Sequence, residues 1–161
     1  RVGRSREEMV PVDCNSLVSE TVDLLAPGEN FTITVQENLP TLVADRTKLG
    51  EVFMNLISNA IKYIDKPQGI IRIGCERDGK GWKFHVSDNG PGIEEKYHEK
   101  VFQIFQTLGP RDTPGSTGVG LAVVKKIVEQ MGGEIWIESA AGAGTTFFFT
   151  IPFRLSEAEL H

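Results

Sequence analysis

The sequence predicts an α+β fold, a two-layer α/β sandwich whose mixed, mostly antiparallel five-stranded sheet carries three helices on one face. Helix-like and strand-like segments follow in the order α-β-(β)-α-β-β and, after a long polar stretch, α-β-β. Short turns such as residues 78–81 (Asp-Gly-Lys-Gly) join neighbouring strands as hairpins, which favours antiparallel pairing. Each helix has one apolar side, so all three can bury that side by packing on one face of the sheet.

Composition limits the size and the class of the protein. The 161 residues suffice for one core, and 40% hydrophobic with 24% charged residues is ordinary for a globular domain. We expect residues 11–155 to form this domain, residues 1–10 to end an upstream helix or linker, and residues 156–161 to be a tail. The net charge of -5 argues against nucleic acid as a partner.

The sequence also indicates a cellular compartment. Cys14 and Cys75 have no metal-ligand spacing, which favours a reducing compartment over a disulfide framework. No apolar run approaches about 18 residues, and there is no signal-peptide pattern. We therefore expect a cytoplasmic domain that makes no membrane contact itself, whether or not its parent protein is anchored.

In the first half of the chain, Asp13 is the expected cap of a helix that runs to Leu25 and ends at Pro27-Gly28. Residues 31–35 alternate apolar and polar side chains as a half-buried strand does, and residues 42–43 form a short strand. Asp45 then caps a helix over residues 47–64. The apolar stripe of that helix comprises Leu49, Val52, Phe53, Leu56, Ala60 and Ile64.

In the second half, residues 71–75 and 82–88 are expected to form a hairpin. A helix over residues 118–131 follows and ends at Gly132-Gly133. Two further strands, residues 135–137 and 147–151, complete the sheet. The inward side of each strand is apolar, which is the pattern of a sheet with one covered face.

Opposite the apolar stripe of the helix over residues 47–64 lie Asn55, Asn59 and Lys62. Asparagine is a poor helix former, so two of them one turn apart need a reason. Two neutral oxygen ligands and a cation in a row suit a hydrated divalent metal and a polyphosphate. The alternative is a solvated face with two incidental asparagines.

Asp88 continues the inward face of the strand that contains Phe84 and Val86. A carboxylate there costs free energy unless something donates to it. It either caps the turn that Asn89-Gly90 begins, or it accepts a hydrogen bond from the exocyclic amine of a base. In the second reading, the glycines let the base approach the backbone.

Two further features have a structural and a functional interpretation. Gly118 and Gly120 open a helix, where free N–H groups favour phosphate, although close packing explains glycine equally well. The spacing fits neither a Rossmann fingerprint nor a Walker A loop. Thr145 has the inward parity of Phe147 and Phe149, and is either structural or part of the same site.

Residues 107–117 are polar and lack apolar periodicity, which is typical of a functional lid. Phe102 and Phe105 either pack in the core or anchor one end of this lid. Arg111 is its cation and reaches either solvent or a terminal phosphate.

Taken in order, these motifs resemble the catalytic and ATP-binding domain of sensor histidine kinases in the GHKL superfamily. Residues 55–63 (Asn-Leu-Ile-Ser-Asn-Ala-Ile-Lys-Tyr) are similar to the N box, and residues 88–93 (Asp-Asn-Gly-Pro-Gly-Ile) to the first glycine box. Residues 102–105 resemble the F box, residues 118–122 the second glycine box, and residues 142–147 the last one. The resemblance covers about residues 12–153.

The resemblance implies the Bergerat fold, with ATP and Mg2+ as ligands. Asp88 would accept from the adenine amine beside a water held by Thr145, and Asn59 would ligate magnesium with support from Asn55. Lys62 and Tyr63 would contact phosphate or ribose. The implied catalytic residues are Asn55, Lys62 and Arg111. The remaining implied nucleotide contacts are Gly90, Gly92, Ile93, Phe105, Gly118, Val119, Gly120 and Leu121.

Two features select a branch of this superfamily. Members that hydrolyse ATP place a glutamate base four residues before the metal asparagine, where this chain has Asn55, which cannot take a proton at neutral pH. The sequence also lacks a phospho-accepting His box. We therefore expect a protein-histidine kinase that holds ATP for an upstream dimerisation domain of its parent, and serves a response regulator indirectly. The alternatives are a serine/threonine kinase of the anti-sigma type and a degenerate nucleotide sensor.

Overall fold

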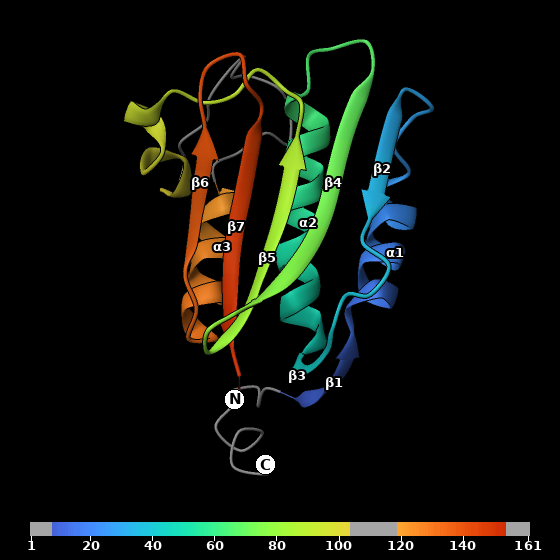
Figure 1. Cartoon of the computed structure of the whole chain (residues 1–161), viewed down its shortest axis with the longest axis vertical. Coiled ribbons are helices and arrows are strands. Elements are labelled where there is room, and N and C mark those ends of the chain that lie inside the picture. Colours follow the sequence, from blue (N-terminus) through green and yellow to red (C-terminus); the bar gives the residue numbers. More distant parts are fainter. Residues whose placement is uncertain (1–7, 104–118, 154–161) are drawn as a thin grey trace.

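A computed structural model describes residues 8–103 and 119–153 of the chain. Its five-stranded sheet has the order β2-β4-β5-β7-β6, in which β2 and β4 are parallel and the other pairs antiparallel. The helices α1, α2 and α3 lie on one face of this sheet (Figure 1). The predicted two-layer architecture is therefore confirmed. The sheet consists of β2 (Phe31–Val35), β4 (Gly69–Asp78), β5 (Gly81–Asp88), β6 (Ile135–Ser139) and β7 (Thr145–Pro152).

The three α-helices in the described ranges begin and end close to the predicted positions. They are α1 (Cys14–Leu25), α2 (Arg46–Tyr63) and α3 (Val119–Gln130). The Asp13 and Asp45 side chains accept hydrogen bonds from the first turns of α1 and α2, which satisfies N–H groups that a helix start leaves unpaired. The predicted apolar stripe of α2 is buried from Leu49 to Ala60, and it includes Ile57 as well.

One strand was not predicted. β1 (Met9–Asp13) pairs antiparallel with β3 (Thr41–Asp45) in a separate two-stranded sheet. Residues 1–10 were expected to end an upstream helix or linker, and β1 contains Pro11. Proline has no N–H to give, but an edge strand that pairs on one side tolerates it. Val12 is buried between exposed neighbours, so the period-two pattern was present but short.

Two short 3-10 helices, η1 (Glu95–Tyr97) and η2 (Lys100–Phe102), follow β5 in the polar stretch for which no element was predicted. Val101 is buried, and the Phe102 ring contacts the Phe147 ring edge-on with centroids 6.0 Å apart. The F box therefore packs against the core through Phe102. Phe105 lies outside the described residues.

The core lies between the helices and the sheet and is centred on three aromatic rings. Phe53 of α2 meets Phe84 and Phe149 edge-on, with centroids 5.7 and 5.6 Å apart, and the last two stack at 5.0 Å. Contacts of this kind add about 0.5–1.5 kcal/mol each to the free energy of area burial. They fix α2 across the middle strands of the sheet.

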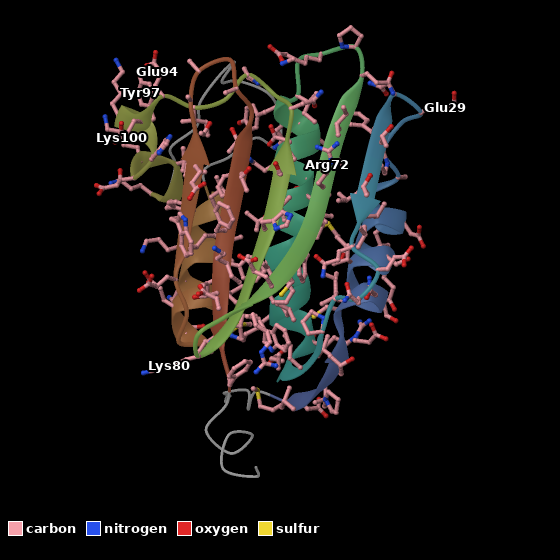
Figure 2. All side chains as sticks on the ribbon, viewed as in Figure 1. Glu29, Arg72, Lys80, Glu94, Tyr97 and Lys100 are labelled. Carbon is pink, nitrogen blue, oxygen red and sulfur yellow. The ribbon has the colours of Figure 1, made fainter. Side chains whose placement is uncertain are left out.

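The sheet face turned away from the helices is polar with an aromatic centre. Arg72 stands on this open face (Figure 2), where Trp136 stacks on Phe148 at 5.4 Å. Ser87 and Thr146, opposite each other on β5 and β7, form a hydroxyl pair at 2.9 Å. His85 lies on this same outward side, opposite Phe148, and partial burial lowers its pKa.

On the helix-facing side, the last rung of the sheet is polar. Asp88, Thr145 and Ser139 are direct neighbours across β5, β7 and β6. The rung before it consists of Val86, Phe147 and Ile137, which are all buried. Because residues opposite each other on antiparallel strands share a face, the apolar core ends at a row of two hydroxyls and a carboxyl group.

Candidate functional site

Asp88 ends β5 on the inward side, as its parity predicted. Its carboxylate accepts the backbone N–H of Gly90 at 2.8 Å. Burial raises the pKa of Asp88, while hydrogen bonds from the backbone N–H groups of Gly90 and Thr145, and the charge of Lys66, act in the opposite direction. The Asp88 carboxylate is therefore half-buried and held by two backbone N–H groups.

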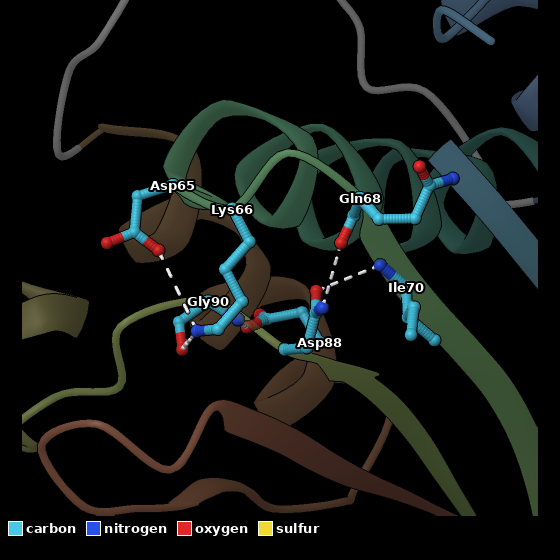
Figure 3. Close-up of polar contacts among 7 residues, drawn as sticks. Asp65, Lys66, Gln68, Ile70, Asp88 and Gly90 are labelled. Carbon is cyan, nitrogen blue, oxygen red and sulfur yellow. Dashed lines mark hydrogen bonds and ion pairs between the residues drawn. The ribbon is translucent and has the colours of Figure 1, made fainter. Parts of the chain in front are cut away.

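The loop after β5 is tied to the start of β4 (Figure 3). The Asn89 side chain accepts the Ile70 N–H at 2.8 Å and donates to the Gln68 carbonyl at 3.0 Å. The Lys66 ammonium lies 3.5 Å from the Gly90 carbonyl and 3.9 Å from the Asp65 carboxylate. Sequence reasoning missed Lys66, although its place directly after the N-box helix could have drawn attention to it.

Two glycines of this region are required by chain packing. Gly92 has φ +81°, and a Cβ added to it would lie 1.9 Å from the Ala140 carbonyl oxygen. Gly144 has φ +79°, and its Cβ would lie 2.4 Å from the Asp88 carbonyl oxygen. Only glycine permits this backbone and this spacing. The glycine boxes thus bring the loop after β5 against the hairpin between β6 and β7.

Ser139 was missed by sequence reasoning and is the most connected side chain of the polar rung. Its oxygen accepts the Ile93 N–H at 2.7 Å and lies 3.0 Å from the Thr145 hydroxyl. The other side of Ile93 is held as well, because its carbonyl accepts from the His98 ring at 2.9 Å. Ser139 has the inward parity of Ile135 and Ile137, and this signal could have placed it beside Thr145.

The polar side of α2 faces the start of α3. The Asn55 amide donates to the Glu51 carbonyl at 2.7 Å, and its oxygen lies 2.7 Å from where a Cβ on Gly120 would be. Gly120 is therefore a close-packing position, the structural interpretation considered above. Asn59 is half-buried, and its side chain makes no hydrogen bond within residues 8–103 and 119–153.

The other predicted site residues are placed as follows. Lys62 is exposed and Tyr63 half-buried at the end of α2, and the Tyr63 carbonyl lies 3.4 Å from the Cβ position of Gly90. Leu121 packs against the core. Val119 begins α3, but its side chain is not described. Phe105, Arg111 and Gly118 lie outside the described residues, as does the predicted lid, residues 107–117.

The donor set suits magnesium better than a metal held by protein alone. Within the described part of the chain, no three His, Cys, Asp or Glu side chains gather at a possible metal site. Asn59 offers an amide oxygen one turn from Asn55. Magnesium usually takes one or two protein ligands and completes its octahedron with water and substrate phosphates. The residues present therefore fit such an ion.

The family of this chain follows from comparison with known proteins. The sequence profile of the family described as histidine kinase-, DNA gyrase B-, and HSP90-like ATPase matches residues 44–155. The chain belongs to this family. Its fold is also that of a solved catalytic domain of histidine kinase ThkA, with a TM-score of 0.75 and 32% identity over 90% of this chain and 95% of that one.

The chain is also similar to one part of several longer proteins. It is 44% identical to Cyanobacterial phytochrome B of Nostoc sp., over 94% of this chain and 21% of the relative. It is 43% identical to the methanogenesis regulatory histidine kinase FilI of Methanothrix harundinacea, over 94% of this chain and 17% of the relative. The chain thus spans about a fifth of these relatives and corresponds to their catalytic ATPase part. No helix in the described ranges is long and apolar enough to cross a membrane.

Proposed function

We propose that this chain binds Mg-ATP at the polar end of the sheet and presents the γ-phosphate to a histidine on a separate dimerisation domain. The observation that carries the proposal is the half-buried Asp88 carboxylate, which lies beside Thr145 and accepts the N–H of Gly90, a residue next to the end of α2. An amine donor on a planar base would satisfy such an acceptor, whereas a half-buried charge without a ligand only costs free energy.

The polyphosphate would extend from the proposed base site along the polar side of α2. Asn59 would supply an oxygen to a magnesium ion, and Asn55, fixed by Glu51 and packed on Gly120, would hold the adjacent position. Bound there, magnesium would neutralise charge that develops on the phosphates. Lys62 would contact the phosphates directly. Full-length ShkA, which is 26% identical with a TM-score of 0.77 over 94% of this chain and 32% of that one, was solved in complex with AMPPNP, and this supports nucleotide binding by the present chain.

Transfer to histidine fits the site better than hydrolysis does. In the transfer step, the γ-phosphorus would bond to an imidazole nitrogen as its bond to the bridging oxygen of ADP breaks, with ADP leaving. In hydrolysis, water takes the place of the histidine as nucleophile and needs a general base to remove its proton. Asn55 cannot act as that base. The donor side of the reaction would then lie in this chain and the acceptor side elsewhere in its parent protein, which would pass the phosphoryl group to a response regulator.

Calorimetric titration of the chain with ATP, ADP and magnesium tests the binding. We expect binding that magnesium strengthens, and absence of nucleotide binding would overturn the proposal. Phosphoamino-acid analysis of the parent protein then separates the rivals. A label that is acid-labile and alkali-stable supports phosphohistidine, whereas phosphoserine on a second protein supports the anti-sigma type of kinase. Binding without any transfer supports a nucleotide sensor.

A further inference from the structure

The Ser139 hydroxyl takes part in three polar contacts but has a single proton. It accepts the Ile93 N–H at 2.7 Å and lies 2.8 Å from the Gly144 carbonyl. A carbonyl oxygen only accepts, so Ser139 donates its proton to Gly144. The third contact, 3.0 Å to the Thr145 oxygen, must then use the proton of Thr145.

The direction of this hydrogen bond decides what the Thr145 hydroxyl can offer to a ligand bound at this end of the sheet. With its proton committed to Ser139, the Thr145 oxygen presents only lone pairs on its other sides. Asp88 is the next residue along the same rung, and its carboxylate is likewise an acceptor. Thr145 is 7% exposed, so an unmatched polar atom against it is costly. Thr145 and Asp88 therefore present acceptors at neighbouring positions of the rung.

We infer that Ser139 is a positioning residue for base selection, which holds Thr145 as an acceptor so that the proposed base site takes a 6-aminopurine and rejects a 6-oxopurine. The inference rests on the proposed function and deepens it. An exocyclic amine brings two N–H donors to a row of acceptors. A 6-oxo group would place its lone pairs against those of Thr145 and Asp88. A site that accepts hydrogen bonds from its ligand therefore rejects a ligand that offers an acceptor at the same position.

The test compares ATP with ITP, whose base has an oxygen in place of the amine. We expect wild type to prefer ATP by tenfold or more. Ser139→Ala frees the Thr145 proton to turn toward the 6-oxo group, and should lower the ATP/ITP affinity ratio about fivefold or more, the value of one hydrogen bond. Ser87→Ala is the matched control, because it removes the equivalent cross-strand hydroxyl pair on the open face. It should leave the ratio unchanged.

A purely structural role would reduce both affinities in Ser139→Ala by the same factor, and an unchanged ratio overturns the inference. Neutron diffraction from crystals of the nucleotide-free chain provides a second measurement. The deuteron of Thr145 should point at Ser139, and that of Ser139 at Gly144. The reverse direction would overturn the inference even if ATP binds. Failure of wild type to bind either nucleotide would overturn base selection together with the proposed function, whatever the deuterons show.

Discussion

At the scale of single residues, Asp88 combines a structural cost with a binding opportunity. Burial raises the pKa of Asp88, so its charged form is less stable in the folded domain than in water. A group whose pKa is raised by folding contributes stability that is present below its unfolded pKa and is lost as the pH rises through the folded pKa. The charged form of the Asp88 carboxylate therefore lowers the free energy of unfolding of the nucleotide-free domain.

Asp88→Asn should separate stability from binding. We expect ATP affinity to fall at least tenfold, since a hydrogen bond to a charged group contributes about 1.5–3 kcal/mol. The empty variant should melt at or above the wild-type temperature at pH 7, because it removes the cost of the buried charge. That advantage should shrink as the pH falls toward 3.8, the unperturbed value. Melting curves at both pH values and calorimetry check this, and unchanged affinity would remove Asp88 from the base pocket.

Asn59→Ala tests the metal assignment. It deletes an oxygen ligand but leaves Asp88 and Thr145 in place, so ATP affinity should fall more with magnesium than with a chelator. Parallel titrations in the two conditions measure the difference. An equal loss in both would identify Asn59 as a structural residue.

At the scale of elements, the site depends on how closely the loop after β5 approaches the β6–β7 hairpin. Two glycines with left-handed φ allow a comparison, because a Cβ on Gly92 meets the Ala140 carbonyl, whereas one on Gly142, with φ +82°, meets nothing within 4 Å. The first position combines backbone strain with a steric conflict, and the second has the strain alone.

Gly92→Ala should therefore destabilise the domain more than Gly142→Ala. Both changes place alanine in the left-handed region, which costs about 1–2 kcal/mol. The clash at Gly92 should add about 1–3 kcal/mol, as overpacking does. Urea denaturation of the two variants gives both values, and equal values would show that the hairpin moves aside without cost.

At the scale of the whole molecule, residues far apart in sequence meet at one end of the sheet. The N-box helix, the ends of β5 and β6 and the start of β7 each contribute one or two groups. Phosphoryl transfer relies on an in-line nucleophile and on charge stabilisation, and a domain that holds only the donor has half of this arrangement.

We therefore expect residues 1–161 alone to hydrolyse ATP very slowly and to show no stable autophosphorylation. Adding the dimerisation domain of the parent protein should restore a label that is acid-labile and alkali-stable. Radiolabelled ATP measures both reactions. Brisk hydrolysis by the isolated chain, abolished by Glu51→Gln but not by Asn55→Ala, would instead place the chain with the ATP-hydrolysing members of its family.

Much of the fold could be read from local patterns, because helix and strand periodicities are properties of consecutive residues. The stripe of α2 and the inward parity of Asp88 and Thr145 were predicted in this way. β4 is longer than predicted, because its far end consists of the exposed residues Glu76, Arg77 and Asp78, which do not alternate. β1 was missed because its pattern is short and contains a proline.

The sequence by itself determined the layers, the helix-facing side of each strand and the set of motifs. Only the tertiary structure decided which strands are neighbours. That strand order places Asp88, Thr145 and Ser139 on one rung of the sheet. Strand order is set by contacts between segments that are distant in the sequence, and the local periodicity of a strand does not predict it. The role of Gly120 was undecided for the same reason, because its Cβ would meet Asn55, a residue of another helix.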